Sequence, residues 1–171
     1  AREMAWTTGH VLTIAQTLND AEMEPVTIEA LLRIGVDALI YATIMTRKVE
    51  VPRQLYSARV PVVLLNCYSD DRHFPSVCPG EVAGGHRATE ALIRAGHRRI
   101  AHITGEMWMD AARDRLRGYR QALATADIPY DPALVREGNW QTSAGYEETH
   151  ALMKLRHPPS AIFCSNDRMA V

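Results

Sequence analysis

The chain has 171 residues, 47% of them hydrophobic and 23% charged, and its 19 lysine and arginine residues nearly balance its 20 aspartate and glutamate residues. This composition is that of an ordinary globular protein, so it excludes intrinsically disordered and fibrous chains. No basic run or charge excess marks a nucleic-acid or membrane surface in this segment. The length is enough for one sizeable domain or for two small lobes.

The cysteines and the hydropathy pattern bear on the compartment. Cys67, Cys78 and Cys164 lack the CxxC spacing of zinc sites, and an odd number leaves one cysteine over from any set of disulfides. The chain shows no signal-peptide pattern, and no apolar stretch approaches the ~18 residues that a membrane span needs. We therefore expect a cytoplasmic protein with no metal, no cofactor and no membrane contact.

Short apolar runs alternate with helical patterns along the chain. The runs are rich in Ile, Val and Leu and lack strict polar alternation, which is typical of strands buried on both faces of a parallel sheet. They are residues 11–15, 38–42, 60–65, 100–104, 134–137 and 161–164. The stretches between them predict helices with apolar stripes: Ile28, Leu31 and Leu32 between Pro25 and Gly35; Leu92 and Ala95 before Gly96; Ala112, Leu116, Tyr119 and Leu123; and Tyr146, His150 and Met153.

This alternation predicts an open α/β fold with parallel sheets and right-handed crossovers. Residues 66–85 interrupt the pattern, because they hold two prolines, three glycines and polar residues in place of a helical stripe. Such a connection in mid-chain is typical of a crossover between two lobes. The predicted lobes are residues 1–79 and 80–171, with a hinge near Pro79 and Gly80.

In open parallel sheets, ligands bind beyond the carboxyl ends of the strands, so the residues there are the candidates for function. They are Thr43, Asn66, Thr104, Gly105, Trp140, Ser165, Asn166 and Asp167. The set holds amides, hydroxyls and one large aromatic side chain, but no nucleophile motif and no phosphate-binding loop. A flat aromatic wall with polar groups around it favours a small hydroxylated ligand such as a sugar or a nucleoside.

The helix predicted around residues 112–123 adds a charged candidate. Arg115 lies on the other side of its apolar stripe from Arg113, Arg117 and Arg120. Near the start of the helix, its guanidinium group could reach the strand ends and donate two parallel hydrogen bonds to adjacent hydroxyls or to a carboxylate. The alternative is a surface salt bridge with a nearby Glu or Asp.

Other polar residues have simpler explanations. His97, Arg98 and Arg99 fall between a helix end and a strand start, where they complement the helix dipole. His102 lies inside a strand and is predicted to be a buried core histidine with a hydrogen-bond partner. Trp140 could equally be a core residue, and Asn66 and Asn166 could be turn residues.

Several segments resemble the effector-binding core of the LacI/GalR family of bacterial transcription repressors. They are GHRRIAHITG (96–105), ARDRLRGYRQAL (112–123), IPYDPALVREGNWQTSAGYEETHALM (128–153) and PSAIFCSNDRMAV (159–171), with IGVDALIYAT (34–43) and VPVVLLN (60–66) before them. Each segment is moderately specific, but their order and spacing together cover nearly the whole chain. The resemblance implies two Rossmann-like lobes of the periplasmic-binding-protein type I fold, which close on a small effector.

The resemblance also implies roles for the candidates and a larger parent protein. Arg115, in the pattern Arg-x-x-Gly-aromatic, would hold ligand hydroxyls; Trp140 would form the aromatic wall, and Asn166 and Asn66 would supply amides. Both lobes would be incomplete here, with residues 1–8 matching the later part of the family's first helix. A separate helix-turn-helix domain would read operator DNA, so this segment alone is expected not to bind it. The parent is expected to be a homodimer.

Two other functions remain open from the sequence. A solute-binding protein of a sugar transporter would share the fold and would carry an export signal in place of the helix-turn-helix. An enzyme acting on a sugar or a nucleotide is the second alternative, although no paired acid and base stand at the strand ends. Asp110 and Asp167 would be its candidate catalytic carboxylates.

Overall fold

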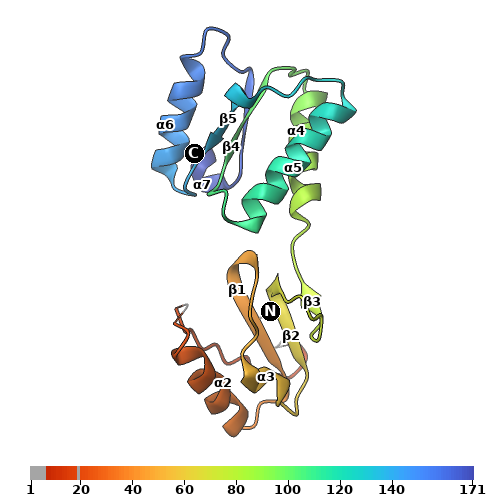
Figure 1. Cartoon of the computed structure of the whole chain (residues 1–171), viewed down its shortest axis with the longest axis vertical. Coiled ribbons are helices and arrows are strands. Elements are labelled where there is room, and N and C mark those ends of the chain that lie inside the picture. The colour runs from red at the N-terminus through yellow and green to blue at the C-terminus, as the bar shows by residue number, and fades with distance from the viewer. Residues whose placement is uncertain (1–6, 19) are drawn as a thin grey trace. The chain divides into compact units, whose positions relative to one another are not determined.

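The computed structural model describes residues 7–18 and 20–171 (Figure 1). Its elements are α2 (Met23–Arg33), β1 (Leu39–Lys48), α3 (Arg53–Tyr56), β2 (Val62–Tyr68), β3 (Ser76–Val77), α4 (Glu81–Arg94), β4 (Ile100–Thr104), α5 (Asp110–Thr125), a 3-10 turn (Pro132–Leu134), β5 (Val135–Glu137), α6 (Thr142–Met153), β6 (Ala161–Cys164) and α7 (Asp167–Ala170). Most of the expected helix at residues 1–8 lies outside the described residues. Within the described part of the chain, no helix is long and apolar enough to cross a membrane.

The strands form two three-stranded sheets, with the orders β1-β2-β3 and β5-β4-β6. β2 pairs with β3, and β4 with both β5 and β6, in parallel. The α/β class with parallel sheets is therefore confirmed. β4 is the central strand of its sheet, and all five of its residues are buried.

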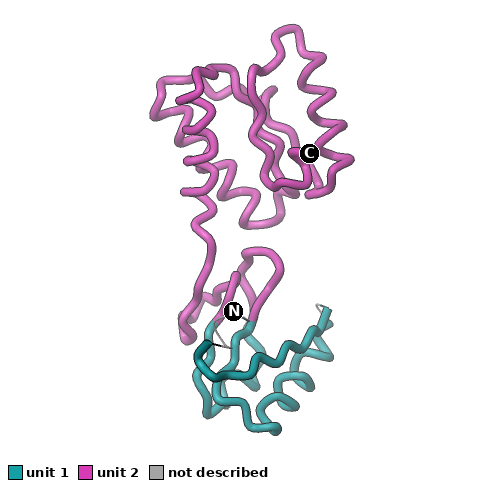
Figure 2. The backbone as a smooth tube through the Cα atoms, turned by 180° about the vertical axis from the view of Figure 1, so that it is seen from behind, with its two compact units in different colours: residues 1–41, 50–63 teal, residues 42–49, 64–171 magenta. Residues whose placement is uncertain are grey.

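The chain divides into two compact units (Figure 2). Unit 1 comprises Ala1–Tyr41 and Glu50–Val63, and unit 2 comprises Ala42–Val49 and Leu64–Val171. Every candidate site residue named from the sequence belongs to unit 2. The lobe boundary at residues 79/80 and the hinge beside it stay predictions.

Three sequence-based expectations about the strands are wrong. Residues 11–15 form no strand, and Val11 and Ile14 are 93% and 73% exposed. An apolar run becomes a strand only where another strand accepts its backbone hydrogen bonds. For the same reason β1 and β2 continue through polar residues, so Thr43 and Asn66 lie inside these strands and not beyond their ends.

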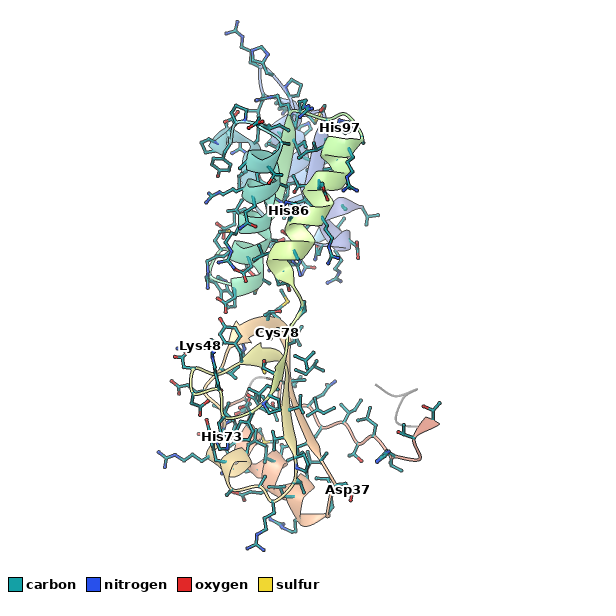
Figure 3. The ribbon with its side chains drawn as sticks, turned by 90° about the vertical axis from the view of Figure 1, so that its right-hand side faces the viewer. Asp37, Lys48, His73, Cys78, His86 and His97 are labelled. Atoms are coloured by element: carbon teal, nitrogen blue, oxygen red, sulfur yellow. The ribbon has the colours of Figure 1, made fainter. Side chains whose placement is uncertain are left out.

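Helix α4 begins earlier than the sequence suggests. Residues 81–85, expected to be part of an irregular connection, form its first turn, and β3 lies in the same stretch. Figure 3 shows Cys78 just before α4, His86 along it and His97 beyond its last turn. Of the glycines that suggested a loop, Gly85 is needed inside the helix, because α5 packs very close to it at this position.

The contact between α4 and α5 is made by backbone on both sides. A Cβ atom on Gly85 would overlap the backbone of Arg115, and one on Gly118 would overlap the backbone of Val82. Both helices lie on the same face of the β4 sheet, side by side (Figure 1). The two glycines therefore fix the separation between α4 and α5 in the turns that contain Glu81 and Arg115.

Residues of β4 pack into two different hydrophobic clusters of unit 2. Ala101 and Ile103 pack with Leu152 of α6 in one cluster, whereas Ile100 packs with the α5 stripe in another. The stripe itself is buried as predicted. The α6 stripe is not: Tyr146 and Met153 are 74% and 53% exposed, and the small residues Ala144 and Gly145 face inward with Leu152. Small side chains let α6 approach its neighbours closely, which a search for large apolar residues does not detect.

His102 is the core histidine that the sequence predicts. It is fully buried and stacks between Phe163, with ring centroids 4.4 Å apart, and Tyr119, at 5.2 Å. Nδ1 lies 2.9 Å from the Phe163 carbonyl oxygen, which can only accept, so Nδ1 carries the hydrogen. Nε2 has no partner among the described residues. Burial lowers the pKa of His102 to about 4.

This depressed pKa predicts a loss of stability in mild acid. An unfolded histidine has a pKa near 6.5, so the unfolded chain binds a proton below that pH. Folded His102 stays neutral until the pH falls to about 4. The neutral His102 therefore does not lower the free energy of unfolding above about pH 6.5. Between pH 7 and pH 4.5 we expect the free energy of unfolding to fall by about 2 kcal/mol. Urea unfolding across this range measures it, with the non-titrating variant His102→Gln and the exposed control His150→Gln. A pH dependence that is identical in wild type and His102→Gln contradicts the prediction.

Candidate functional site

The predicted site residues Arg115, Trp140 and Asn166 come together at the carboxyl edge of the β4 sheet. Arg115 comes from the second turn of α5, Trp140 lies three residues beyond β5, and Asn166 caps α7 after β6. The Arg115 Cζ atom lies 5.6 Å from the centroid of the Trp140 ring. The Asn166 side-chain amide donates a hydrogen bond of 3.0 Å to the Trp140 carbonyl oxygen.

Arg115 is held by an ion pair that the sequence kept only as an alternative. Its Nε donates to Glu81 Oε2 at 2.6 Å, and its Nη1 donates to the backbone carbonyl of Ser165. The pair is not a surface salt bridge, because the two side chains are only 24% and 8% exposed. The guanidinium plane is thus fixed between α4, the end of β6 and the indole ring.

Trp140 sits in a left-handed backbone conformation, with φ at 67°. Its ring packs against Gly105, directly after β4, where a Cβ atom would overlap the indole. Its Nε1 is buried and finds no hydrogen-bond partner within the described residues. Ser165 is also buried, and its Oγ is likewise unpartnered within residues 7–18 and 20–171. Two buried polar atoms near Arg115 therefore lack the hydrogen-bond partner that such atoms usually have, as far as the described residues go.

Asn166 uses its side chain locally. Its Oδ1 accepts from the Met169 backbone N–H at 3.0 Å, which caps α7, while its amide nitrogen bonds Trp140. This is the turn-residue alternative that the sequence analysis kept open. In this arrangement Asn166 holds the Trp140 segment in place.

The side chains of Thr43 in β1 and Asn66 in β2 each form hydrogen bonds with the backbone of the other strand. The Thr43 hydroxyl donates to the Asn66 carbonyl at 2.8 Å, and the Asn66 amide donates to the carbonyls of Thr43 and Ile44 at 3.0 and 2.9 Å. Asn66 takes a positive φ of 60° inside β2, which opens the strand locally. Both side chains thereby tie β1 to β2.

Two residues that sequence reasoning missed continue this network. The Thr46 hydroxyl lies 2.5 Å from Asn66 Oδ1 and 3.2 Å from Glu81 Oε1, and its single hydrogen serves one acceptor at a time. Thr46 and Glu81 are both buried. No local signal in the sequence marks Glu81, because residues 81–85 look like part of an irregular connection and the partner of Glu81 is 34 residues away.

Catalytic groups are not evident in this arrangement. Among the described residues, no cluster of three or more His, Cys, Asp or Glu side chains could hold a metal ion. Burial raises the pKa of the Cys67 and Cys164 thiols, which disfavours the reactive thiolate form. The site offers a cation, an aromatic face and neutral hydrogen-bonding groups, which suit binding.

A cavity of about 290 Å³ lies elsewhere in unit 2, at the amino end of β4. Arg98, Arg99, Ile100 and Tyr119 contribute to its lining. Arg99 there is paired with Asp131 at 3.1 Å and bonds the His157 carbonyl. This is the opposite edge of the sheet from Trp140, so the cavity is separate from the candidate site.

The comparison with protein families identifies the fold and the class of site. The family described as periplasmic binding proteins and the sugar binding domain of the LacI family matches residues 2–171. The chain belongs to the LacI family. It is 31% identical to the ribose operon repressor of Haemophilus influenzae over 160 residues, which are 94% of this chain and 48% of that protein. It is 27% identical to the transcriptional repressor PurR of Actinobacillus pleuropneumoniae over 171 residues, or 99% of this chain and 50% of that one.

Solved structures of LacI-family regulators show the same fold. A sugar-binding transcriptional regulator of this family from Escherichia coli, complexed with phosphate, has a TM-score of 0.73 at 31% identity, covering 98% of this chain and 60% of the other. The regulator CelR in complex with cellobiose has a TM-score of 0.70 at 30% identity, covering 96% and 50%. The chain spans about half the length of the curated repressors that it matches. It corresponds to the periplasmic-binding-protein-like, effector-binding part of the LacI-family regulators that it matches.

Proposed function

We propose that this LacI-family domain binds a small hydroxylated molecule, a sugar or a nucleoside, at Arg115 and Trp140. The observation that carries the proposal is a pair of buried polar atoms, Trp140 Nε1 and Ser165 Oγ, that find no partner in the described part of the chain and lie on the two segments that contact Arg115. Leaving such atoms unbonded costs about 1–3 kcal/mol each. Ligand hydroxyls would satisfy them while a C–H face of the ligand packs on the indole.

In this proposal the other candidates support the site. Thr43, Asn66 and Asn166 bond backbone groups of neighbouring segments, and direct contact of their side chains with the ligand remains a prediction. Ligand binding would shift the domain between two conformations and so change the operator affinity of a DNA-binding domain outside this chain. The proposed parent is a cytoplasmic, non-enzymatic homodimer. Its repressor relatives favour this function over an exported solute-binding protein.

The first test is ligand binding by the intact protein and by Trp140→Ala. We expect calorimetric titration with a panel of sugars and nucleosides to find at least one ligand, and Trp140→Ala to weaken it by about tenfold or more, because the aromatic face is lost. Tyr146→Ala, which removes an exposed aromatic side chain from α6, is the matched control and should leave the affinity unchanged. Equal affinities for wild type and Trp140→Ala would remove Trp140 from the site.

A further inference from the structure

Glu81 places a buried negative charge directly beside the proposed ligand-binding cation. Its carboxylate is 8% exposed, accepts from Arg115 Nε at 2.6 Å, and lies 3.2 Å from the Thr46 hydroxyl, whose hydrogen it shares as an alternative acceptor with Asn66. The two opposite charges of such a buried ion pair largely cancel each other for an approaching ligand. Arg115 therefore offers hydrogen bonds to a ligand without offering a full positive charge.

The packing of α4 on α5 keeps the two charges together. Gly85 lies one helical turn after Glu81 and touches the Arg115 backbone, while Gly118 lies three residues after Arg115 and touches the backbone of Val82. Backbone contacts on both sides of the pair leave α4 no room to shift toward α5. The ion pair is thus a fixed part of the site, and an incoming ligand meets Arg115 with Glu81 already bound to it.

Two of the five guanidinium N–H groups of Arg115 are already bonded to protein acceptors. A carboxylate or a phosphate binds arginine most strongly through two parallel hydrogen bonds. Here Nε is bonded to Glu81 and Nη1 to the Ser165 carbonyl, and only Nη2 has no partner within the described residues. The nearby atoms that lack partners, Trp140 Nε1 and Ser165 Oγ, belong to uncharged groups.

Building on the proposed function, we infer that the site selects uncharged polyhydroxy ligands and rejects their carboxylated or phosphorylated counterparts, with Glu81 as the residue that excludes the anion. An anionic group next to Arg115 would lie within a few ångströms of the Glu81 carboxylate in a poorly solvated environment. Like charges at such a distance repel strongly. Neutral hydroxyls meet no such penalty and can donate to the carboxylate or accept from Nη2.

Matched pairs of ligands test this selectivity on the intact protein. Calorimetric titration would compare D-ribose with ribose 5-phosphate, D-galactose with D-galacturonate, and adenosine with adenosine monophosphate. In the pair that contains the tightest ligand, we expect the neutral member to bind wild type about tenfold or more tightly than the anion. Glu81→Gln should shift that ratio by about tenfold or more toward the anion. Glu90→Gln, which removes a carboxylate from the same helix away from Arg115, should leave it unchanged.

The outcomes separate this inference from the proposed function. If wild type prefers the anion, or if Glu81→Gln leaves the ratio as it was, the selectivity is wrong while ligand binding stands. If no member of the panel binds, the proposed function is contradicted and the selectivity falls with it. Circular dichroism melting establishes that Glu81→Gln is folded, and the wild-type ratio alone can overturn the inference if the variant is not.

Discussion

Replacing Arg115 with alanine is expected to lower the free energy of unfolding by about 3 kcal/mol and to weaken ligand binding by about 100-fold or more. The stability loss follows because the substitution leaves the Glu81 carboxylate buried without its cation. The binding loss follows because the guanidinium contacts both Trp140 and the Ser165 segment. Urea unfolding and calorimetric titration measure the two effects separately.

A double variant distinguishes these two roles of Arg115. Adding Glu81→Gln to Arg115→Ala removes the stranded charge, so the double variant should recover most of the lost stability but none of the lost affinity. Arg115→Lys provides a further comparison, because it keeps the charge and loses the planar fork. A double variant as unstable as Arg115→Ala alone would mean that the buried carboxylate is not the source of the instability.

The second large effect is expected at Gly85. Gly85→Ala should destabilise the protein by about 2–3 kcal/mol, because the new Cβ overlaps the Arg115 backbone and α4 must move away from α5. Its neighbour Gly84 is an ideal control, since a Cβ there meets nothing within 4 Å. Gly84→Ala should instead stabilise the helix by up to about 1 kcal/mol.

Opposite signs at adjacent positions of one helix would be strong support for the close contact. Urea unfolding of both variants gives the comparison directly. Gly85→Ala should also weaken ligand binding, because it moves the Glu81 carboxylate relative to Arg115. Similar stabilities for Gly85→Ala and Gly84→Ala would contradict the packing described for α4 and α5.

The apolar pattern of the sequence predicts a strand correctly where the three-dimensional packing gives that segment a neighbouring strand. Residues 100–104 and 161–164 are strands with the predicted bounds, because these two apolar runs pair with each other in parallel. Residues 11–15 carry a similar run and form no strand, since an apolar run does not itself supply a hydrogen-bonding partner. The glycines at 84 and 85 predict a loop by composition but lie in α4, where Gly85 gives the room for a close contact with the Arg115 backbone.

The candidate site likewise contains residues that the sequence predicts and a residue, Glu81, that it does not. The rule that ligands bind at strand ends, together with the helical phase of Arg115, brings out Arg115 and Trp140, which the structure places 5.6 Å apart. Glu81 escaped prediction because its partner is 34 residues away in sequence. Nothing in its immediate neighbours signals that approach. Long-range pairs of this kind emerge only from three-dimensional packing.

The α4–α5 contact also has a mechanical consequence. At Gly85 and Gly118 one main chain presses directly on the other, so no pliable layer of side chains lies between the helices to absorb a displacement. A displacement of the Arg115 segment would therefore move the first turn of α4 directly, and with it the Pro79–Gly80 stretch that precedes this helix. The two helices would then move as one stiff unit, with the proposed ligand site and the connection between the predicted lobes at the same end of it, because Arg115 contacts Glu81 and Glu81 directly follows Gly80.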